Sequence, residues 1–131
     1  MRYLLDTGIF LWSLDPFEKL NQIAQDILGE NKDDLYLSAV SSWEISIKAG
    51  VGKLQLPGPP QQYVPHRMST QGFRGLQITH EHALAVSELP RHHNDPFDRL
   101  LIAQARTENM VLMTADTEFR KYPVEILWCG K

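Results

Sequence analysis

Short apolar runs alternate with segments of helical periodicity along almost the whole chain. Such runs are typical of strands that are covered on both faces, and strands connected through helices pair in parallel. The sequence therefore predicts an α/β fold in which a mainly parallel sheet of about five strands lies between helices. The expected strands are residues 2–5, 35–37, 76–78, 111–113 and 124–128.

Helix signals occupy the segments between these runs. Ser38, Thr79 and Asp95 can each cap the start of a helix, and Gly29 can end one. A further helix can begin at Pro59 or Pro60, with an interruption or restart at Pro65. The other expected helices are residues 7–14, an amphipathic segment from Leu20 to Leu28, residues 38–48, residues 79–89 and the segment that follows Asp95.

The bulk properties bound the class of protein. The chain has 131 residues, 43% of them hydrophobic and 22% charged, which predicts one globular domain over residues 1–131. No apolar run is long enough to span a bilayer, and the N-terminus lacks the features of a signal peptide. Cys129 is the only cysteine and cannot form an internal disulfide, so we expect a cytoplasmic protein.

Four acidic residues lie where the predicted strands and helices meet. Asp6 directly follows the first strand, Asp116 lies just beyond the fourth, and Glu44 is in the helix after the second. The carboxyl ends of parallel strands form a ligand crevice, so these three point toward one edge of the sheet. Asp98 joins them if the start of its helix lies at the same edge. Converging carboxylates favour Mg²⁺ or Mn²⁺, which can activate water for phosphodiester cleavage.

Each acid also has a structural alternative. Asp95 and Asp98 together make a good helix start, Asp116 can be a turn residue, and Glu44 can be an exposed helix residue. Asp6 is the hardest to explain structurally, because it follows a buried strand and has no obvious capping role.

Four ordered motifs resemble the signature of the PIN-domain family, and most of all its VapC branch, the toxins of toxin–antitoxin pairs. They are Leu4-Leu5-Asp6-Thr7, the segment from Ser38 to Ile45, Asp95-Pro96-Phe97-Asp98-Arg99 with the helix to Ala105, and Thr114-Ala115-Asp116. The resemblance implies that Asp6, Glu44, Asp98 and Asp116 bind the metal and are catalytic. It also implies that Thr7, Thr114 and Asp95 support these acids.

The same resemblance implies a function and partners. Proteins of this kind cleave RNA with Mg²⁺ or Mn²⁺, usually as homodimers, and a small antitoxin protein inhibits them. Gly8 departs from the family, which often has a polar residue at that position.

The formal net charge of −3 neither supports nor excludes RNA binding. Without the four acids, 12 acidic residues remain against 13 basic ones, so the rest of the chain is about neutral. Lys48, Arg91 and Arg99 are the candidates for contact with phosphate.

Other readings are weaker. A zinc site is one alternative, suggested by the histidines His80, His82, His92 and His93. Their spacing favours solvated histidines instead. The tripeptide Asp6-Thr7-Gly8 matches that of aspartic proteases, but these need two copies and the sequence has one. A phosphatase that forms an aspartyl phosphate needs a second acid two residues after the first, and Gly8 occupies that position.

Two alternatives within the same family stay open: a PIN-like nuclease without a toxin role, and a non-catalytic PIN-like binding module. The tryptophans Trp12, Trp43 and Trp128 are expected in the core.

Overall fold

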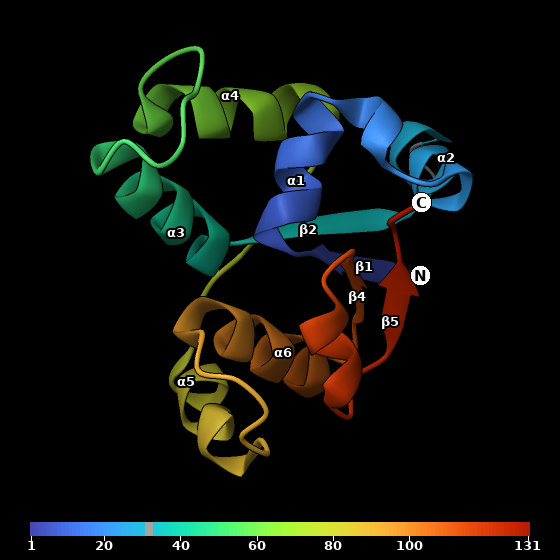
Figure 1. The fold of residues 1–131 in the computed structure, drawn as a ribbon, viewed down its shortest axis with the longest axis vertical. Coiled ribbons are helices and arrows are strands. Elements are labelled where there is room, and N and C mark those ends of the chain that lie inside the picture. Colours follow the sequence, from blue (N-terminus) through green and yellow to red (C-terminus); the bar gives the residue numbers. More distant parts are fainter. Residues whose placement is uncertain (31–32) are drawn as a thin grey trace.

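The computed structural model describes residues 1–30 and 33–131, and these residues contain one five-stranded parallel sheet in the order β3-β2-β1-β4-β5. The predicted α/β class is confirmed (Figure 1). The strands are β1 (Arg2–Leu5), β2 (Asp34–Ser38), β3 (Arg74–Leu76), β4 (Val111–Thr114) and β5 (Ile126–Trp128). The α-helices are α1 (Thr7–Leu14), α2 (Gln22–Glu30), α3 (Ala39–Gly50), α4 (Pro60–Gln71), α5 (His80–Ala85) and α6 (Pro96–Glu108).

Helices cover both faces of the sheet. Side chains alternate along each strand, so Leu5 of β1 packs into the core under α1, α2 and α4, whereas Leu4 packs into the core under α5 and α6. Figure 1 shows these two groups of helices on opposite sides of the sheet. Helix α3 contacts α1, α4 and α6, and it contributes Ile45 to the first core and Val40 to the second. The helix is therefore held by both layers.

The strand order defines a crevice between β1 and β4. The chain moves outward from β1 to β2 and β3 on one side, and β4 and β5 add to the other side. At such a reversal the connections leave the sheet in opposite directions, and the carboxyl ends of the two strands border an open space. Asp6 follows β1, and its backbone N–H donates to Met113 of β4 at 3.0 Å. The fold thus opens a ligand crevice at Asp6.

Side-chain caps hold the helix starts at this edge. Ser38 accepts from the N–H of Val40, and Asp95 accepts from the N–H of Asp98, as predicted. Asp6 caps α1 by accepting from the N–H of Ile9 at 2.7 Å. The view that Asp6 has no capping role was wrong.

Several boundaries differ from the sequence prediction. Strand β3 is Arg74–Leu76 rather than 76–78, because its pairing with β2 ends where Leu76 meets Ser38. Gly29 lies inside α2, and Pro65 lies inside α4 without breaking it, while its neighbour Val64 is buried in the core.

Two other elements are shorter than expected. The segment 79–89 divides into α5 and the 3₁₀ turn η2 (Val86–Glu88), and β5 begins at Ile126 rather than at 124. Two further 3₁₀ turns are η1 (Phe17–Lys19) and η3 (Thr117–Lys121). No helix in the described part of the chain is long and apolar enough to cross a membrane.

Candidate metal centre

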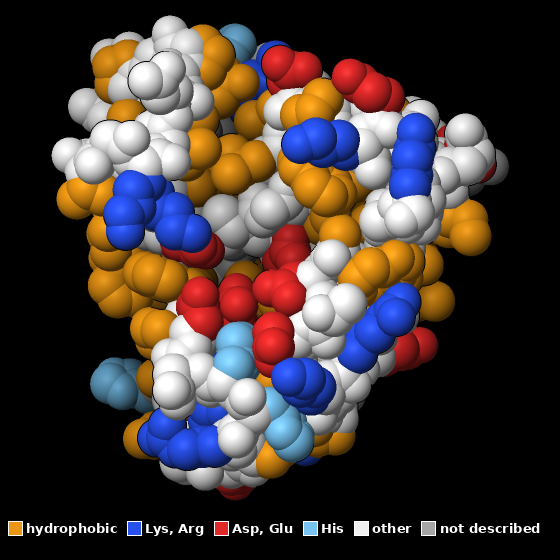
Figure 2. All heavy atoms as spheres, viewed as in Figure 1, with side chains coloured by type: hydrophobic (Ala, Val, Ile, Leu, Met, Phe, Trp, Pro, Cys, Tyr) orange, Lys and Arg blue, Asp and Glu red, His pale blue; other side chains and the backbone are white. Residues whose placement is uncertain are grey.

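A cavity of about 470 Å³ lies at the carboxyl edge of β1 and β4. Figure 2 shows acidic side chains gathered in a hollow at the centre of this face, with Lys and Arg side chains around the margin. The cavity contains all four predicted metal ligands, together with Asp95, Thr7 and Lys48. The lining residues are Asp6, Thr7, Gly8, Ile9, Trp12, Glu44, Lys48, Asp95, Asp98, Ala115, Asp116, Thr117 and Phe119.

Asp6 is fixed at the floor of this cavity by hydrogen bonds to both carboxylate oxygens. Oδ1 accepts from Ile9 N, and Oδ2 accepts from the hydroxyl of Thr114 at 2.5 Å. The Thr114 hydroxyl in turn accepts from the N–H of Asp116 at 3.1 Å, so it links two of the acids. Burial raises the pKa of Asp6 to about 6, with the charges of Asp116 and Glu44 adding to the rise and the two hydrogen bonds opposing it.

Glu44 is buried on α3, with 5% of its surface exposed. Its Oε1 accepts from the Thr7 hydroxyl at 2.6 Å, and its Oε2 accepts from the Lys48 ammonium at 2.5 Å. That hydrogen bond raises the pKa of Lys48, which stays half exposed at the cavity wall. Ser41, one turn earlier on α3, lies with its hydroxyl 2.9 Å from that of Thr7. The sequence analysis missed Ser41, although its spacing of three from Glu44 places both on one helix face.

Asp98 enters the cavity from the first turn of α6, so the condition that its helix begin at this edge is met. Burial raises the pKa of Asp98 to about 8, and the charge of Asp95 is the next largest cause. Glu44, Asp6 and Asp116 raise it further. The negative charges of these four acids therefore oppose ionisation of Asp98.

Asp116 and Asp95 combine a place in the cavity with a local structural role. Asp116 is exposed, and its Oδ1 accepts from Glu118 N at 2.9 Å at the start of η3. Asp95 accepts from Asp98 N at 3.0 Å at the start of α6. The structural alternatives raised for these acids are therefore real, but they coexist with a position at the site.

The lining fits a hard divalent cation better than any other ligand class. Among the described residues that line the cavity, five are carboxylates and Lys48 alone is basic, so a cation would relieve repulsion. Within residues 1–30 and 33–131, however, no three Asp, Glu, His or Cys side chains are spaced as a preformed metal cluster. Mg²⁺ usually keeps several of its waters and takes only one or two protein carboxylates, so it does not require such a cluster.

Two predicted phosphate contacts do not reach the cavity. Arg99 is 6% exposed and donates to the carbonyls of Pro90 and Val86 and to the hydroxyl of Tyr122. Arg91 is exposed but does not line the cavity. Lys48 is thus the predicted basic residue that remains at the site.

The tryptophan and histidine expectations need correction. Trp43 is 54% exposed on α3 and contacts Phe97, so it is not a core residue. His82 is buried with its Nε2 2.8 Å from Glu108, and His93 is half buried with its Nε2 3.2 Å from Asp98. Both were expected to be solvated, and the second is a site neighbour that sequence spacing alone did not reveal.

Comparisons with known proteins agree with this architecture. A family model for the PIN domain matches residues 3–125. The chain is 29% identical over 121 residues to ribonuclease VapC22 of Mycobacterium tuberculosis, covering 91% of this chain and 90% of that protein. It is 38% identical over 68 residues to ribonuclease VapC16 of the same organism, covering 52% of this chain and 45% of that protein.

Solved structures give the same result for the fold. VapBC2 from Rickettsia felis, bound to a promoter DNA fragment, aligns with a TM-score of 0.75 at 18% identity, over 99% of this chain and 100% of that one. VapBC from Salmonella typhimurium aligns with a TM-score of 0.72 at 17% identity, over 98% of each chain. At this level of identity the likeness concerns the fold alone. The match of the family model over nearly the whole length shows that the chain belongs to the PIN-domain family.

Proposed function

We propose that this chain is a metal-dependent endoribonuclease that uses Mg²⁺ or Mn²⁺. The observation that carries the proposal is the convergence of Asp6, Glu44, Asp98 and Asp116 on one cavity at the reversal of the strand order. The two relatives named as ribonucleases support RNA as the substrate.

The side chains of the cavity would divide the work in a definite way. Asp6, Glu44, Asp98 and Asp116 would hold the ion, while Thr114 and Thr7 orient Asp6 and Glu44 through their hydroxyls. A divalent ion bound there supplies an activated water and offsets the charge that grows on the phosphate. Lys48 stands at the wall as the donor for a phosphate oxygen, and its release from Glu44 would accompany binding.

Cleavage of RNA by purified protein tests this function. Mg²⁺ or Mn²⁺ should activate cleavage, EDTA should abolish it, and Asp98→Asn should lower it at least a hundredfold. Asp26→Asn is the matched control, because Asp26 is an exposed acid on α2 outside the cavity. If the Asp98→Asn protein cleaves RNA as fast as the wild type, or if the wild type cleaves fully in EDTA, the proposal is contradicted.

We also propose that the protein is the toxin of a toxin–antitoxin pair, acts in the cytoplasm as a homodimer and is inhibited by a small antitoxin protein. The support is the VapC names of the two relatives and the toxin–antitoxin complexes among the similar structures. Expression alone should arrest growth, and co-expression of the adjacent small gene should restore it. Light scattering should give twice the chain mass of 15.0 kDa.

These two proposals can fail separately. If expression is harmless and the purified protein binds no product of a neighbouring gene, the toxin role is wrong. Metal-dependent cleavage in vitro would then still establish the nuclease.

A further inference from the structure

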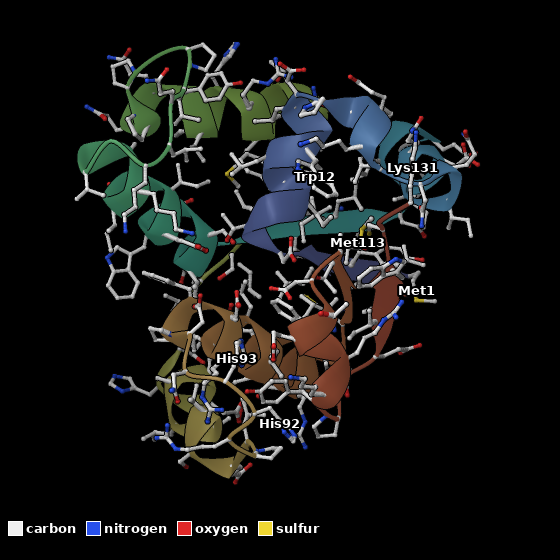
Figure 3. The ribbon with its side chains drawn as sticks, in the orientation of Figure 1. Met1, Trp12, His92, His93, Met113 and Lys131 are labelled. Atoms are coloured by element: carbon white, nitrogen blue, oxygen red, sulfur yellow. The ribbon has the colours of Figure 1, made fainter. Side chains whose placement is uncertain are left out.

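A chain of hydrogen bonds runs from Asp98 into the interior of the protein. His93 Nε2 lies 3.2 Å from Asp98 Oδ2, and His93 Nδ1 lies 2.7 Å from the hydroxyl of Tyr122. The same hydroxyl accepts from the backbone N–H of His93 at 3.2 Å and from Arg99 Nη1 at 3.2 Å. Figure 3 shows His93 and His92 on the segment that precedes α6, with His93 nearer to the acidic hollow.

Arg99 fixes the direction of the hydrogen bonds at the inner end of this series. Its guanidinium is buried and also donates to the carbonyls of Pro90 and Val86. A guanidinium has only donors, so the bond to Tyr122 has a single possible direction, from Arg99 to the hydroxyl oxygen. The backbone N–H of His93 is likewise only a donor. The residue that sequence analysis assigned to phosphate is therefore part of the frame behind the site.

These two donors determine the direction of every remaining bond. A tyrosine hydroxyl can accept two hydrogen bonds and donate one. Because Arg99 and the His93 N–H occupy both acceptor positions, the Tyr122 proton must point to His93 Nδ1. Nδ1 is then an acceptor without a proton, and the proton of the neutral ring lies on Nε2, directed at Asp98.

We propose that Tyr122 and Arg99 lock His93 in its Nε2–H tautomer, and that His93 is a positioning residue that orients the Asp98 carboxylate for metal binding. Partners behind a metal ligand commonly fix its orientation in this way, and their loss typically weakens metal binding about 10- to 100-fold. The metal part of this inference rests on the proposed function, whereas the tautomer depends only on the hydrogen bonds.

The adjacent histidine provides a matched control. The ring of His92 also packs against Tyr122, with centroids 5.0 Å apart, but His92 is exposed. In the described structure it has no hydrogen bond to Asp98. Replacing His92 changes the same loop and removes the same kind of ring, including its contact with Tyr122, but removes no donor or acceptor of the proposed hydrogen bonds.

The first test is a two-dimensional ¹H–¹⁵N spectrum of the histidine rings in the metal-free wild-type protein at pH 8. The expected result is that His93, assigned by its loss in His93→Ala, gives the pattern of the Nε2–H tautomer. Tyr122→Phe should release the ring to a mixture of tautomers, and His92→Ala should leave the His93 tautomer unchanged. An Nδ1–H or doubly protonated His93 ring in the wild type overturns the inference.

The second test measures Mn²⁺ affinity by calorimetry in the absence of RNA. The dissociation constant should rise about tenfold in His93→Ala, rise less in His93→Gln, whose amide can donate from the position of Nε2, and not change in His92→Ala. Wild-type affinity in His93→Ala overturns the positioning role. Thermal melting checks each fold, and if Tyr122→Phe does not fold, the wild-type spectrum and the His93 variants decide. If both tests succeed but RNA is not cleaved, the proposed function fails and this inference stands.

Discussion

Asp98 has the most perturbed carboxyl group of the site, and its charge has a cost in the metal-free protein. The pKa of this group is about 8 in the folded protein against an ordinary value of 3.8. Below a pH of about 4 the carboxyl is protonated in both the folded and unfolded states. The penalty grows as the pH rises toward about 8 and is constant above that, because only the folded state resists ionisation.

Asp98→Asn should therefore stabilise the metal-free protein. The gain in the free energy of unfolding should be about 1 kcal/mol or more at pH 8, since one pKa unit is worth about 1.4 kcal/mol and the lost helix-dipole interaction costs roughly 0.3–1 kcal/mol. Urea unfolding in EDTA at pH 5 and pH 8 measures it, and the gain should be larger at pH 8. A variant less stable than wild type at pH 8 would show that Asp98 is mainly a structural residue.

Asp6 requires a different prediction, because it both caps α1 and binds the Thr114 hydroxyl. Asn is as good a cap as Asp and removes the charge, so Asp6→Asn should leave the metal-free protein at least as stable as wild type near pH 8. Asp6→Ala loses the cap and should cost roughly 1–2 kcal/mol. Thermal melting in EDTA compares the two variants. Equal destabilisation by both would mean that the carboxylate itself is structurally required.

At the scale of residues, the sequence indicated the acids and their supports Thr7, Thr114 and Asp95, but not the position of His93 or Arg99. Asp6, Glu44 and Asp116 were assigned to one edge because strand ends and helix starts are readable from local patterns. His93 and Arg99 were misjudged because the direction of a side chain depends on contacts across the fold, such as that between Arg99 and Tyr122, 23 residues apart in the sequence.

At the scale of elements, the start of α6 joins a structural and an electrostatic role in Asp95. Its side chain caps the helix, and its charge is the largest cause after burial of the raised Asp98 pKa. Asp95→Asn should keep the cap and lower the Asp98 pKa, whereas Asp95→Ala should lose roughly 1 kcal/mol of stability. Carboxyl titration followed by NMR, together with melting curves, separates the two effects. An Asp98 pKa that is unchanged in Asp95→Asn would rule out the electrostatic role.

Local sequence patterns predict the boundaries of some elements but not of others. β1 and α1 were predicted to the residue, because Asp6 separates an apolar run from a helical one. β3 was misplaced by two residues, since its limits depend on pairing with β2 rather than on its own residues. Trp43 was assigned to the core from its residue type, although α3 turns that side chain outward and Glu44 inward.

At the scale of the whole molecule, the topology gathers negative charge that no single element carries. The ends of β1 and β4, the middle of α3 and the first turn of α6 each contribute one predicted ligand, and these come from all parts of the sequence between residues 6 and 116. Without these four acids, 12 acidic residues remain against 13 basic ones, so the four account for the excess negative charge of the chain. A protein assembled in this way should depend on its metal for part of its stability.

Metal binding should accordingly change how stability depends on pH. Without metal, stability should fall as the pH rises from about 5 to 8, because the pKa values of Asp6, about 6, and Asp98, about 8, are both raised in the folded state. Mn²⁺ needs ionised carboxylates, so its stabilising effect should grow over the same interval, with protons released on binding. At about 100 times its dissociation constant, Mn²⁺ should stabilise the wild type by roughly 2.7 kcal/mol.

Melting curves with EDTA and with Mn²⁺ measure this difference for wild type, Asp98→Asn and the control Asp26→Asn. The control should respond as the wild type does and Asp98→Asn should respond less. A Mn²⁺ shift that is the same at every pH and in all three proteins would place the ion outside this cavity.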